Sequence, residues 1–253
     1  MENTPITTLI TGASSGFGAA MARRLHLRGH RLLLNARRTD RIESLLRDLD
    51  PRGDRGHRAL IFDVRDRAAV EASAAEMRLE ISELDVLINN AGLALGLGGI
   101  DQGNPDHWDA MVDTNVKGLL YVTRAFLPLM NPGAHILNIG SVAGKQVYPN
   151  GNVYCASKHA VDALSRAMRL DLLERGIKVS NIAPGMAETE FALVRFEGDA
   201  AKAASVYQGL KPLTAEDIAE TADWILSRPA HVCINDVLIM PSAQADALRT
   251  LRN

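Results

Sequence analysis

The chain has 253 residues, of which 47% are hydrophobic, so it can form one large α/β domain or two small ones with a full core. Its 28 basic and 30 acidic residues give a formal charge of −2, and the lack of a basic excess argues against a nucleic-acid-binding protein. The two cysteines and seven histidines show no metal-ligand spacing and no disulfide framework, so we expect no metal site.

The first strand and helix are predicted on either side of a glycine-rich turn. Residues 6–11 form a short β-branched run, and an amphipathic stretch extends to Leu27. The turn between them contributes Gly12, Ser14, Ser15, Gly16, Phe17 and Gly18. Glycines let the backbone approach a pyrophosphate, and a helix N-terminus supplies free N–H donors. The turn therefore predicts dinucleotide binding, although a plain strand-to-helix turn could have the same sequence.

The second strand, residues 31–36, is followed by Arg37 and Arg38. In dinucleotide folds the end of this strand meets the adenosine ribose, where an NAD site usually has Asp or Glu. A guanidinium group can instead bind a 2′-phosphate through paired, charge-assisted hydrogen bonds. The two arginines therefore predict NADP as the cofactor. The alternative is that they begin a solvated helix.

The third and fourth strands also end in polar or small residues. Residues 57–63 form the third strand, and Asp63 with Val64 lies at its end. Asp63 could accept a hydrogen bond from an adenine amino group, or cap the next helix at 67–80. The fourth strand, 85–89, has a wholly apolar centre, as a buried parallel strand requires. Small and amide side chains follow it and are predicted to line the crevice beyond the strand ends: Asn90, Ala91 and Gly92.

The middle of the chain contains two candidate polar residues. Residues 93–104 are glycine-rich and are predicted to form a surface loop near the site. A long helix is predicted over 108–130 and contains Asn115, a mediocre helix residue that is either incidental or marks a kink with a polar role. Ser141 lies just beyond the fifth strand, 134–140, at the sheet edge where α/β proteins place their chemistry. Ser141 could also simply turn the chain.

Tyr154 and Lys158 lie four residues apart at the start of a predicted helix that extends to about Arg175. Residues at this spacing share one helix face, so the hydroxyl and the ammonium can approach the same point. A free phenol has a pKa of about 10, and a neighbouring cation lowers it. The pair predicts general acid/base chemistry on a hydroxyl or carbonyl. Alone, the same spacing occurs on many solvated helices.

The remaining elements complete an alternation of strands and helices. They are a strand at 178–183 that ends at Pro184 and Gly185, a helix at 200–210, a helix at 214–227 and a strand at 235–240. The alternation predicts an α/β fold with a doubly wound, mostly parallel sheet and helices on both faces. No linker divides the chain, so we expect one domain over 1–253. Residues from about 190 to 212 are expected to form a substrate lid.

Taken together, these motifs resemble the short-chain dehydrogenase/reductase family over almost the whole chain. The matching residues are Thr11-Gly12-xxx-Gly16-x-Gly18, Asn89-Asn90-Ala91-Gly92, Asn115, Ser141, Tyr154-xxx-Lys158 and Pro184-Gly185. The resemblance implies a single Rossmann-like domain with a seven-stranded sheet. It also implies a nicotinamide cofactor and a homotetramer, packed through the helices at 108–130 and 155–175.

The resemblance further implies a role for each matched side chain. Ser141 would hydrogen-bond the substrate oxygen, and Tyr154 would donate or accept the proton. Lys158 would hold the ribose hydroxyls and lower the pKa of Tyr154, while Asn115 would hold a water that links Lys158 to solvent. Thr189 would contact the nicotinamide side of the cofactor, beside Tyr154, Lys158, Pro184 and Gly185.

A narrower resemblance concerns the substrate. Residues 90–96, 148–154 and 194–199 look like the NADP-dependent branch that oxidises 3-hydroxy acids such as L-serine and L-allo-threonine, and reduces malonic semialdehyde. An acidic substrate needs a cation, for which Arg195 is the first candidate and Lys145 the second. Either could be an ordinary surface charge. Glu197 and residues 145–147 depart from the pattern of the branch, so a sulfoacetaldehyde reductase remains open.

Other functions of the same fold remain as alternatives. One is a reductase of 3-oxoacyl-carrier-protein substrates or lipophilic ketones. Another is a nucleotide-sensing protein without turnover, although such proteins typically lose the tyrosine or the lysine. The start of the chain has no signal-peptide pattern, and no apolar run approaches about 20 residues. We therefore expect a cytoplasmic enzyme that acts on a small molecule and binds neither nucleic acid nor membrane.

Overall fold

A computed structural model of the chain describes residues 5–253. The seven strands form one sheet in the order β3-β2-β1-β4-β5-β6-β7, and every neighbouring pair is parallel. The strands are β1 Thr7–Ile10, β2 Arg31–Ala36, β3 Arg58–Ile61, β4 Val86–Asn89, β5 His135–Ile139, β6 Lys178–Pro184 and β7 Asp236–Ile239. The order changes direction at β1 and β4, and ligands of such sheets bind beyond the strand ends at this switch.

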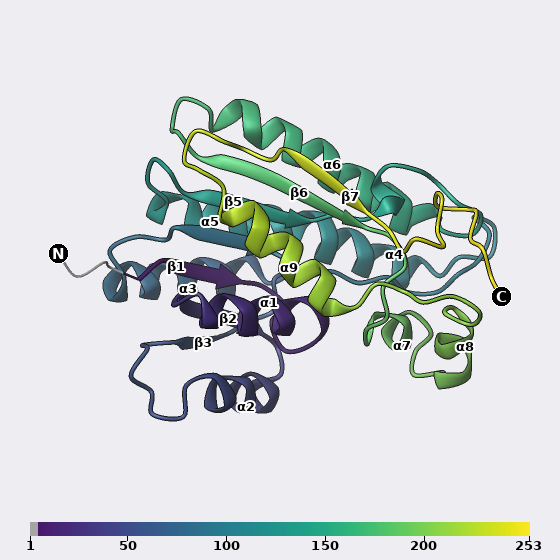
Figure 1. Cartoon of the computed structure of the whole chain (residues 1–253), viewed down its shortest axis with the longest axis horizontal. Helices are drawn as coiled ribbons and strands as arrows, with labels where there is room; N and C mark the ends of the chain where they lie inside the picture. Colours follow the sequence, from purple (N-terminus) through teal and green to yellow (C-terminus); the bar gives the residue numbers. More distant parts are fainter. Residues whose placement is uncertain (1–4) are drawn as a thin grey trace.

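Helices cover both faces of the sheet in a single doubly wound domain, as predicted (Figure 1). On one face lie α1 Gly16–Leu27, α2 Thr39–Leu49 and α9 Ala215–Leu226. On the other lie α3 Arg67–Glu80, α4 Pro105–Val112, α5 Leu119–Phe126 and α6 Asn152–Asp171. Two short helices, α7 Phe191–Arg195 and α8 Ala200–Ser205, lie apart from both layers near the carboxyl ends of the strands.

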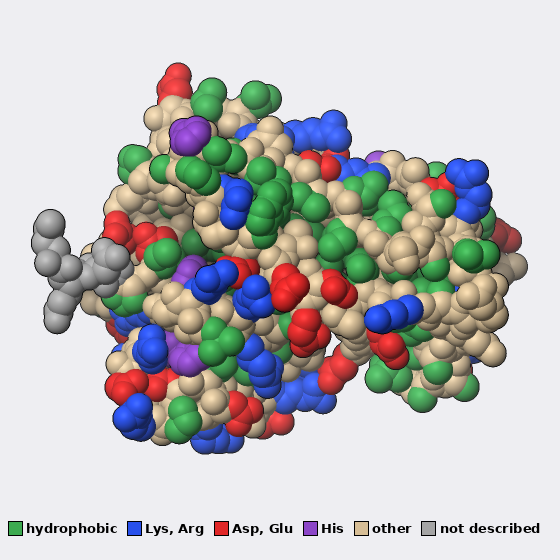
Figure 2. Space-filling view, in the orientation of Figure 1, with side chains coloured by type: hydrophobic (Ala, Val, Ile, Leu, Met, Phe, Trp, Pro, Cys, Tyr) green, Lys and Arg blue, Asp and Glu red, His purple; other side chains and the backbone are tan. Residues whose placement is uncertain are grey.

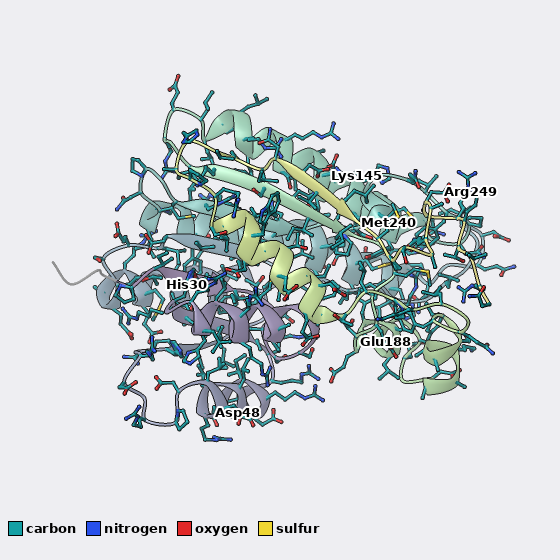
Figure 3. The ribbon with its side chains drawn as sticks, viewed as in Figure 1. His30, Asp48, Lys145, Glu188, Met240 and Arg249 are labelled. Carbon is teal, nitrogen blue, oxygen red and sulfur yellow. The ribbon has the colours of Figure 1, made fainter. Side chains whose placement is uncertain are left out.

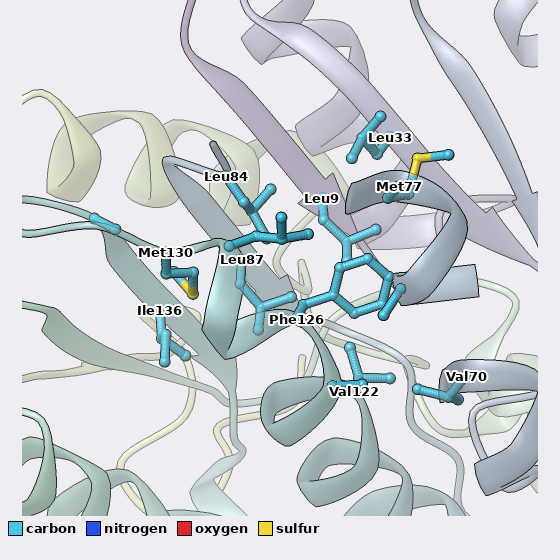
Figure 4. Packing of buried hydrophobic residues seen from close by; sticks show 14 of the residues in the cluster. Leu9, Leu33, Val70, Met77, Leu84, Leu87, Val122, Phe126, Met130 and Ile136 are labelled. Atoms are coloured by element: carbon cyan, nitrogen blue, oxygen red, sulfur yellow. The ribbon is translucent and has the colours of Figure 1, made fainter. Parts of the chain in front are cut away.

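The core on the α3, α5 and α6 face is centred on the fully buried Phe126 (Figure 4). Its ring lies among strand residues such as Leu9 and Leu87 and helix residues such as Met77 and Val122. Burying each such side chain contributes about 1.5–3 kcal/mol relative to exposure. A second core fills the space between the sheet and α1, α2 and α9. The central strands are thus buried on both faces, which explains their nearly continuous apolar sequences, whereas the edge strands β3 and β7 are partly exposed.

A buried carboxylate joins α1 to α9. Asp223 on α9 is 5% exposed and accepts hydrogen bonds from Arg24 Nε at 2.9 Å and from Arg28 Nη2 at 2.8 Å. Burial alone would raise the pKa of Asp223, but the hydrogen bonds from Arg28 and Arg24 bring it below its ordinary value. The carboxylate therefore stays charged at neutral pH and fixes α1, the helix that follows the glycine turn.

The helix predicted over 108–130 is interrupted. It begins earlier, as α4, and then changes to a π-helical turn, η1 Asp113–Gly118, which contains Asn115. It continues as α5 and ends in a 3₁₀ turn, η2 Leu127–Leu129. A π-helical turn inside an α-helix re-aims the side chains it contains and is frequent at functional sites. Of the two readings of Asn115, the structure supports the local irregularity with a polar role.

The lid region and α6 differ from their predicted bounds. Residues 200–210 were expected to form one helix, but α8 ends at Ser205, and the five-residue α7 precedes it. The helix predicted to extend to about Arg175 ends at Asp171, and the turn after it uses Gly176 at φ +64°. The short α7 and α8 carry too few turns for hydrophobic periodicity to mark their ends.

Within 5–253, no helix is long and apolar enough to cross a bilayer. The same residues contain no group of three or more His, Cys, Asp and Glu side chains placed to hold a metal ion. On the face shown in Figure 2, acidic and basic side chains are intermixed over α1, α2 and α9.

Candidate active site

A cavity of about 740 Å³ opens at the carboxyl ends of the strands, beside α7 and α8. Most of the residues predicted for the site line it: Gly12, Ser14, Ser15, Gly16, Phe17, Arg37, Arg38, Asp63, Val64, Asn90, Ala91, Gly92, Ser141, Tyr154, Pro184, Gly185, Thr189 and Arg195. Gly18, Asn115 and Lys158 are buried instead, directly behind this wall. Segments from the whole length of the chain therefore meet at one place.

The glycine turn leaves room and donors for a phosphate group. Gly12 and Gly16 have φ of +64° and +51°, a region that favours glycine. A Cβ on Gly18 would lie 2.4 Å from the carbonyl oxygen of Gly12. The N-cap residue of α1, Ser15, makes no side-chain hydrogen bond to the helix. The N–H groups of the first turn of α1 therefore remain available to an anion. The turn fits the pyrophosphate of a dinucleotide.

Asn90 fixes the shape of this turn. Its amide nitrogen Nδ2 donates to the carbonyl oxygens of Thr11 at 2.8 Å and Gly12 at 3.1 Å. The Thr11 hydroxyl in turn accepts from the backbone nitrogens of Asn90 and Ala91 at 3.0 Å. The segment after β4 and the turn after β1 are thus joined at the switch of the sheet.

Of the two arginines after β2, Arg38 lies nearer the glycine turn. Its Nη2 donates to Ser14 Oγ at 3.2 Å and to Ser15 Oγ at 3.4 Å. Arg37 is 63% exposed, and its Nη1 lies 3.6 Å from a carboxylate oxygen of Asp63. Two cations with serine hydroxyls beside them can bind a phosphate monoester. This geometry fits a 2′-phosphate, with Arg38 better placed than Arg37.

Asp63 does not cap the following helix, so that alternative is wrong. The N-cap of α3 is Asp66, whose side chain accepts from the backbone nitrogen of Ala69. Asp63 instead binds Arg65, with Nη2 at 2.7 Å and Nε at 3.0 Å from Oδ2. It also lines the cavity, so its contact with an adenine stays a prediction.

Ser141 and Tyr154 both line the cavity, and their side chains are within hydrogen-bonding reach of each other. Ser141 caps a 3₁₀ turn, η3 Val142–Gly144, and its Oγ accepts from the backbone nitrogen of Ala143 at 3.1 Å. Tyr154 is 8% exposed on α6. Burial raises the pKa of its hydroxyl, while Ser141 and the Arg195 guanidinium act in the opposite direction. The net direction is opposite to the one predicted from the Tyr154–Lys158 spacing.

The reason lies in the position of Lys158. Its Nζ donates to the carbonyl oxygen of Ile139 at 2.9 Å, so the ammonium is bound to the end of β5. Burial lowers the pKa of Lys158 to about 8, because the charged form is poorly solvated. Lys158 is therefore still largely protonated at pH 7 and holds its proton less firmly than an exposed lysine.

Asn115 supports the loop beside Lys158. Its Oδ1 accepts from the backbone nitrogen of Leu93 at 2.8 Å, and its Nδ2 donates to the Leu93 carbonyl at 2.8 Å and to Ser157 Oγ at 3.0 Å. A Cβ on Gly92 would lie 3.2 Å from Asn115 Oδ1 and 3.4 Å from Lys158 Nζ. The glycine therefore allows the amide and the ammonium to approach each other.

The two candidate cations for an acidic substrate lie in different surroundings. The guanidinium carbon of Arg195 lies 5.5 Å from the ring centroid of Tyr154 and 5.7 Å from that of Tyr148. Lys145 pairs instead with Asp162 and with Asp236 on β7, where it lies beside the strand (Figure 3). It does not line the cavity, and its side chain is only 18% exposed, so Lys145 is held in a partly buried ion-pair cluster rather than being an ordinary surface charge.

Several wall residues carry no motif and were not predicted. From the end of the chain come Gln244, whose Oε1 accepts from the backbone nitrogen of Met186 at 2.7 Å, and Arg252, whose Nη2 donates to the carbonyl of Val206 at 3.1 Å. Tyr148 and Phe191 add aromatic surface. The tyrosine was noticed only as part of the narrower resemblance.

A family model described as short chain dehydrogenase matches residues 7–199. The chain belongs to the short-chain dehydrogenase/reductase family. Within this family, the chain is similar to the NADP-dependent 3-hydroxy acid dehydrogenase of Salmonella typhi, with 45% identity over 94% of this chain and 96% of the relative. It is equally similar to sulfoacetaldehyde reductase 2 of Chromohalobacter salexigens, at 45% identity over 94% of each.

Solved structures confirm the Rossmann-like fold of this short-chain dehydrogenase/reductase. A serine dehydrogenase in its closed form with NADP+ is 40% identical, with a TM-score of 0.90, over 98% of this chain and 100% of that chain. A serine dehydrogenase from Escherichia coli is 37% identical, with a TM-score of 0.80. The predicted family and fold are thus confirmed, and the chain is an oxidoreductase of this family.

Proposed function

We propose that the chain is an NADP-dependent oxidoreductase that interconverts a small hydroxy acid and its aldehyde or ketone. The substrates we expect are 3-hydroxy acids such as L-serine and L-allo-threonine, with malonic semialdehyde as a carbonyl form. The observation that carries the proposal is the Arg195 guanidinium, which lies over the rings of Tyr148 and Tyr154 in the cavity that Ser141 also lines. A cation at this distance from the phenol suits a substrate that has a carboxylate beside its reacting carbon. The names of the similar proteins support the same chemistry.

The cofactor would occupy the wall from the glycine turn to the end of β6. Its pyrophosphate would lie on the turn at Gly12–Gly18, its 2′-phosphate by Arg38, Arg37, Ser14 and Ser15, and its nicotinamide near Thr189 and Pro184-Gly185. When bound, the nicotinamide supplies the hydride acceptor or donor. The protein's part is to orient the reactants and to exclude water from the carbon that reacts.

The side chains of the chain itself would handle the proton. Ser141 Oγ would hydrogen-bond the substrate oxygen, and the Tyr154 hydroxyl would give its proton to that oxygen in reduction or accept it in oxidation. Lys158 would favour the phenolate form by its charge and bind ribose hydroxyls. Asn115 would hold the segment after β4 in place and a water that connects Lys158 to solvent.

A sulfonated aldehyde is the second candidate substrate. A sulfonate carries the same single charge as a carboxylate, so Arg195 could bind either, and the 45% identity to a sulfoacetaldehyde reductase favours this reading specifically. The two kinds of substrate differ in size. A sulfonate has three oxygens and is bulkier than a carboxylate, so the side chains of Tyr148 and Phe191, which line the cavity, would restrict its binding more.

The test is a set of initial rates measured by the absorbance of reduced nicotinamide. NADP+ and NAD+ are each combined with L-serine, L-allo-threonine and 3-hydroxypropionate. NADPH and NADH are each combined with malonic semialdehyde and sulfoacetaldehyde. We expect turnover with NADP(H) and the carboxylate substrates. Turnover only with sulfoacetaldehyde selects the second candidate, and turnover only with neutral carbonyls contradicts both.

Replacing Arg195 with Gln should raise KM for the acidic substrate by about 10- to 100-fold, since a hydrogen bond to a charged group contributes about 1.5–3 kcal/mol. The value of kcat should fall less, because the proton donor and Ser141 remain. Arg249→Gln is the matched control, because Arg249 is bound to Asp246 and does not line the cavity. Equal KM increases for an acidic and a neutral aldehyde would contradict a carboxylate-binding role.

We also propose a cytoplasmic homotetramer. Exposed apolar side chains lie on helices predicted for the interface, namely Val112 on α4 and Leu120 on α5. A further pair, Trp224 and Leu238, lies on α9 and the edge strand β7 and is 45% and 47% exposed. Mass photometry should give a particle of four 27.4 kDa chains. A monomeric mass at all concentrations would exclude the tetramer.

A further inference from the structure

Glu190 lies between the lid and the arginines proposed to bind the 2′-phosphate. It follows Thr189 and is the residue immediately before α7. Both of its carboxylate oxygens accept from Arg41 Nη1, at 2.7 and 2.9 Å. One of them also lies 3.5 Å from Arg38 Nη2. The side chains of these three residues are 43–45% exposed.

A single nitrogen of Arg38 therefore lies between two partners. Arg38 Nη2 is 3.2 Å from Ser14 Oγ, on the side of the glycine turn, and 3.5 Å from Glu190, on the side of the lid. Arg38 and Glu190 both line the cavity, whereas Arg41 is outside its wall. Arg41 thus has its charge directed at Glu190 rather than into the phosphate site.

The charges make Glu190 a competitor of the phosphate. The hydrogen bond from Arg41 holds the pKa of Glu190 below its ordinary value, so the side chain is a carboxylate at neutral pH. A phosphate monoester carries a charge between about −1.5 and −2 at pH 7. A phosphate on Ser14 and Arg38 would therefore share an arginine with a like-charged carboxylate. Ion pairs this exposed are weak and rearrange easily.

We propose that Glu190 is a specificity-determining residue that limits the affinity for the 2′-phosphate of NADP by holding Arg41 away from it and competing for Arg38. The inference rests on the proposed NADP dependence. It predicts that NADP is bound less tightly than three nearby arginines would allow, which favours release of the spent cofactor. NAD has no 2′-phosphate and is unaffected by Glu190.

The test is calorimetric titration of NADP+, NAD+ and 2′,5′-ADP, with no turnover involved. Glu190→Gln keeps the shape of the side chain, and because Glu190 makes no side-chain cap bond to α7, no helix cap is lost. We expect it to bind NADP+ and 2′,5′-ADP about three- to tenfold more tightly, with a smaller gain at high salt, and NAD+ within about twofold of the original protein. The double variant Glu190→Gln with Arg41→Met should lose the part of the gain that comes from the freed Arg41 and keep only the smaller part that comes from Arg38.

A matched control is Glu80→Gln. Glu80 is a carboxylate on α3 that accepts from Arg58 at 2.9 Å and does not line the cavity, so its loss should leave all three affinities unchanged. The proposal is overturned if Glu190→Gln weakens NADP+ binding, if it changes NAD+ affinity to the same extent, or if the double variant keeps the whole gain. The unmodified protein distinguishes the two proposals, because equal affinity for NADP+ and NAD+ there contradicts the NADP assignment itself.

Discussion

Replacing Tyr154 with Phe is expected to lower kcat by about 10²- to 10⁴-fold, the usual contribution of a positioned general acid or base. The affinity for NADP+ should stay within about twofold, because the substitution removes one hydroxyl and keeps the ring. That ring packs against Phe191, with centroids 5.7 Å apart, and lies under the Arg195 guanidinium. Initial rates with the best substrate and calorimetric titration of NADP+ measure the two quantities separately.

Tyr148→Phe is the matched control for this experiment. Tyr148 lines the same cavity, and its hydroxyl also has a pKa raised by burial. Its ring lies 5.7 Å from the guanidinium carbon of the same arginine. Tyr154 differs from Tyr148 in its spacing of four residues from Lys158 and in the hydrogen bond with Ser141 that acts to lower its pKa. We expect Tyr148→Phe to retain most of the turnover. Undiminished turnover in Tyr154→Phe would refute the proposed proton donor, and a loss confined to Tyr148→Phe would transfer the role to Tyr148.

The sheet and its glycine turn could be predicted because their signals are local. Strand residues such as Leu33 and Leu87 belong to short apolar runs, and each run is buried in the sheet it predicts. The Tyr154–Lys158 spacing and Ser141 at the end of β5 were likewise visible within single elements. A parallel α/β sheet brings the carboxyl ends of its strands to one edge. Local motifs at those ends therefore predicted a common site.

The electrostatics of the site could not be predicted from spacing. The spacing of Tyr154 and Lys158 suggests a lowered tyrosine pKa, but the structure shows the Lys158 ammonium bound to Ile139, a residue of another element. The full burial of both groups then dominates each pKa. The burial of a residue depends on all the elements that pack around it, so it cannot be predicted from the spacing of two residues in the sequence.

Long-range partners are also invisible in the sequence. Lys145 looked like a candidate for an acidic substrate until Asp236, which follows it by 91 residues, was found beside it. Glu190 and Arg41 are 149 residues apart in the sequence, and their side chains are hydrogen-bonded in the structure. No sequence motif marks Arg252 and Gln244 as cavity residues. The path of the chain after β7 brings them to the cavity, and the sequence does not reveal that path. Such contacts decide which charges are free to bind a ligand.

The π-helical turn shows how one local irregularity serves the site. Asn115 is 1% exposed and uses both ends of its amide to hold Leu93, so the segment after β4 has a fixed path. That path places Gly92 against Lys158, where a Cβ would be in tight contact with Asn115 Oδ1 and Lys158 Nζ. A regular helix would rotate the amide away from Leu93. The irregularity thus supports the position of Lys158.

Replacing Lys158 with Met is expected to lower the oxidation rate at pH 7 by about 100-fold or more, because the phenolate form of Tyr154 loses its neighbouring cation. Lys158 has a pKa of about 8, so at pH 7 the original protein carries this cation, which would offset part of the burial that raises the pKa of Tyr154. Without the cation, the rise of the rate with pH should move to higher pH. Tyr154 and Lys158 titrate as a coupled pair, so the measured value belongs to both.

The measurement is the pH dependence of kcat with NADP+ over roughly pH 6 to 10, the interval in which the coupled titration is followed. NADP+ affinity should also fall, by about tenfold, if Lys158 binds the ribose hydroxyls. Lys117→Met is the control, since Lys117 lies in the same π-helical turn as Asn115 but is 54% exposed and bound to Asp113. A Lys158→Met profile that keeps its original midpoint would show that the ammonium does not act on Tyr154. Lys158 would then hold the cofactor and the end of β5 only.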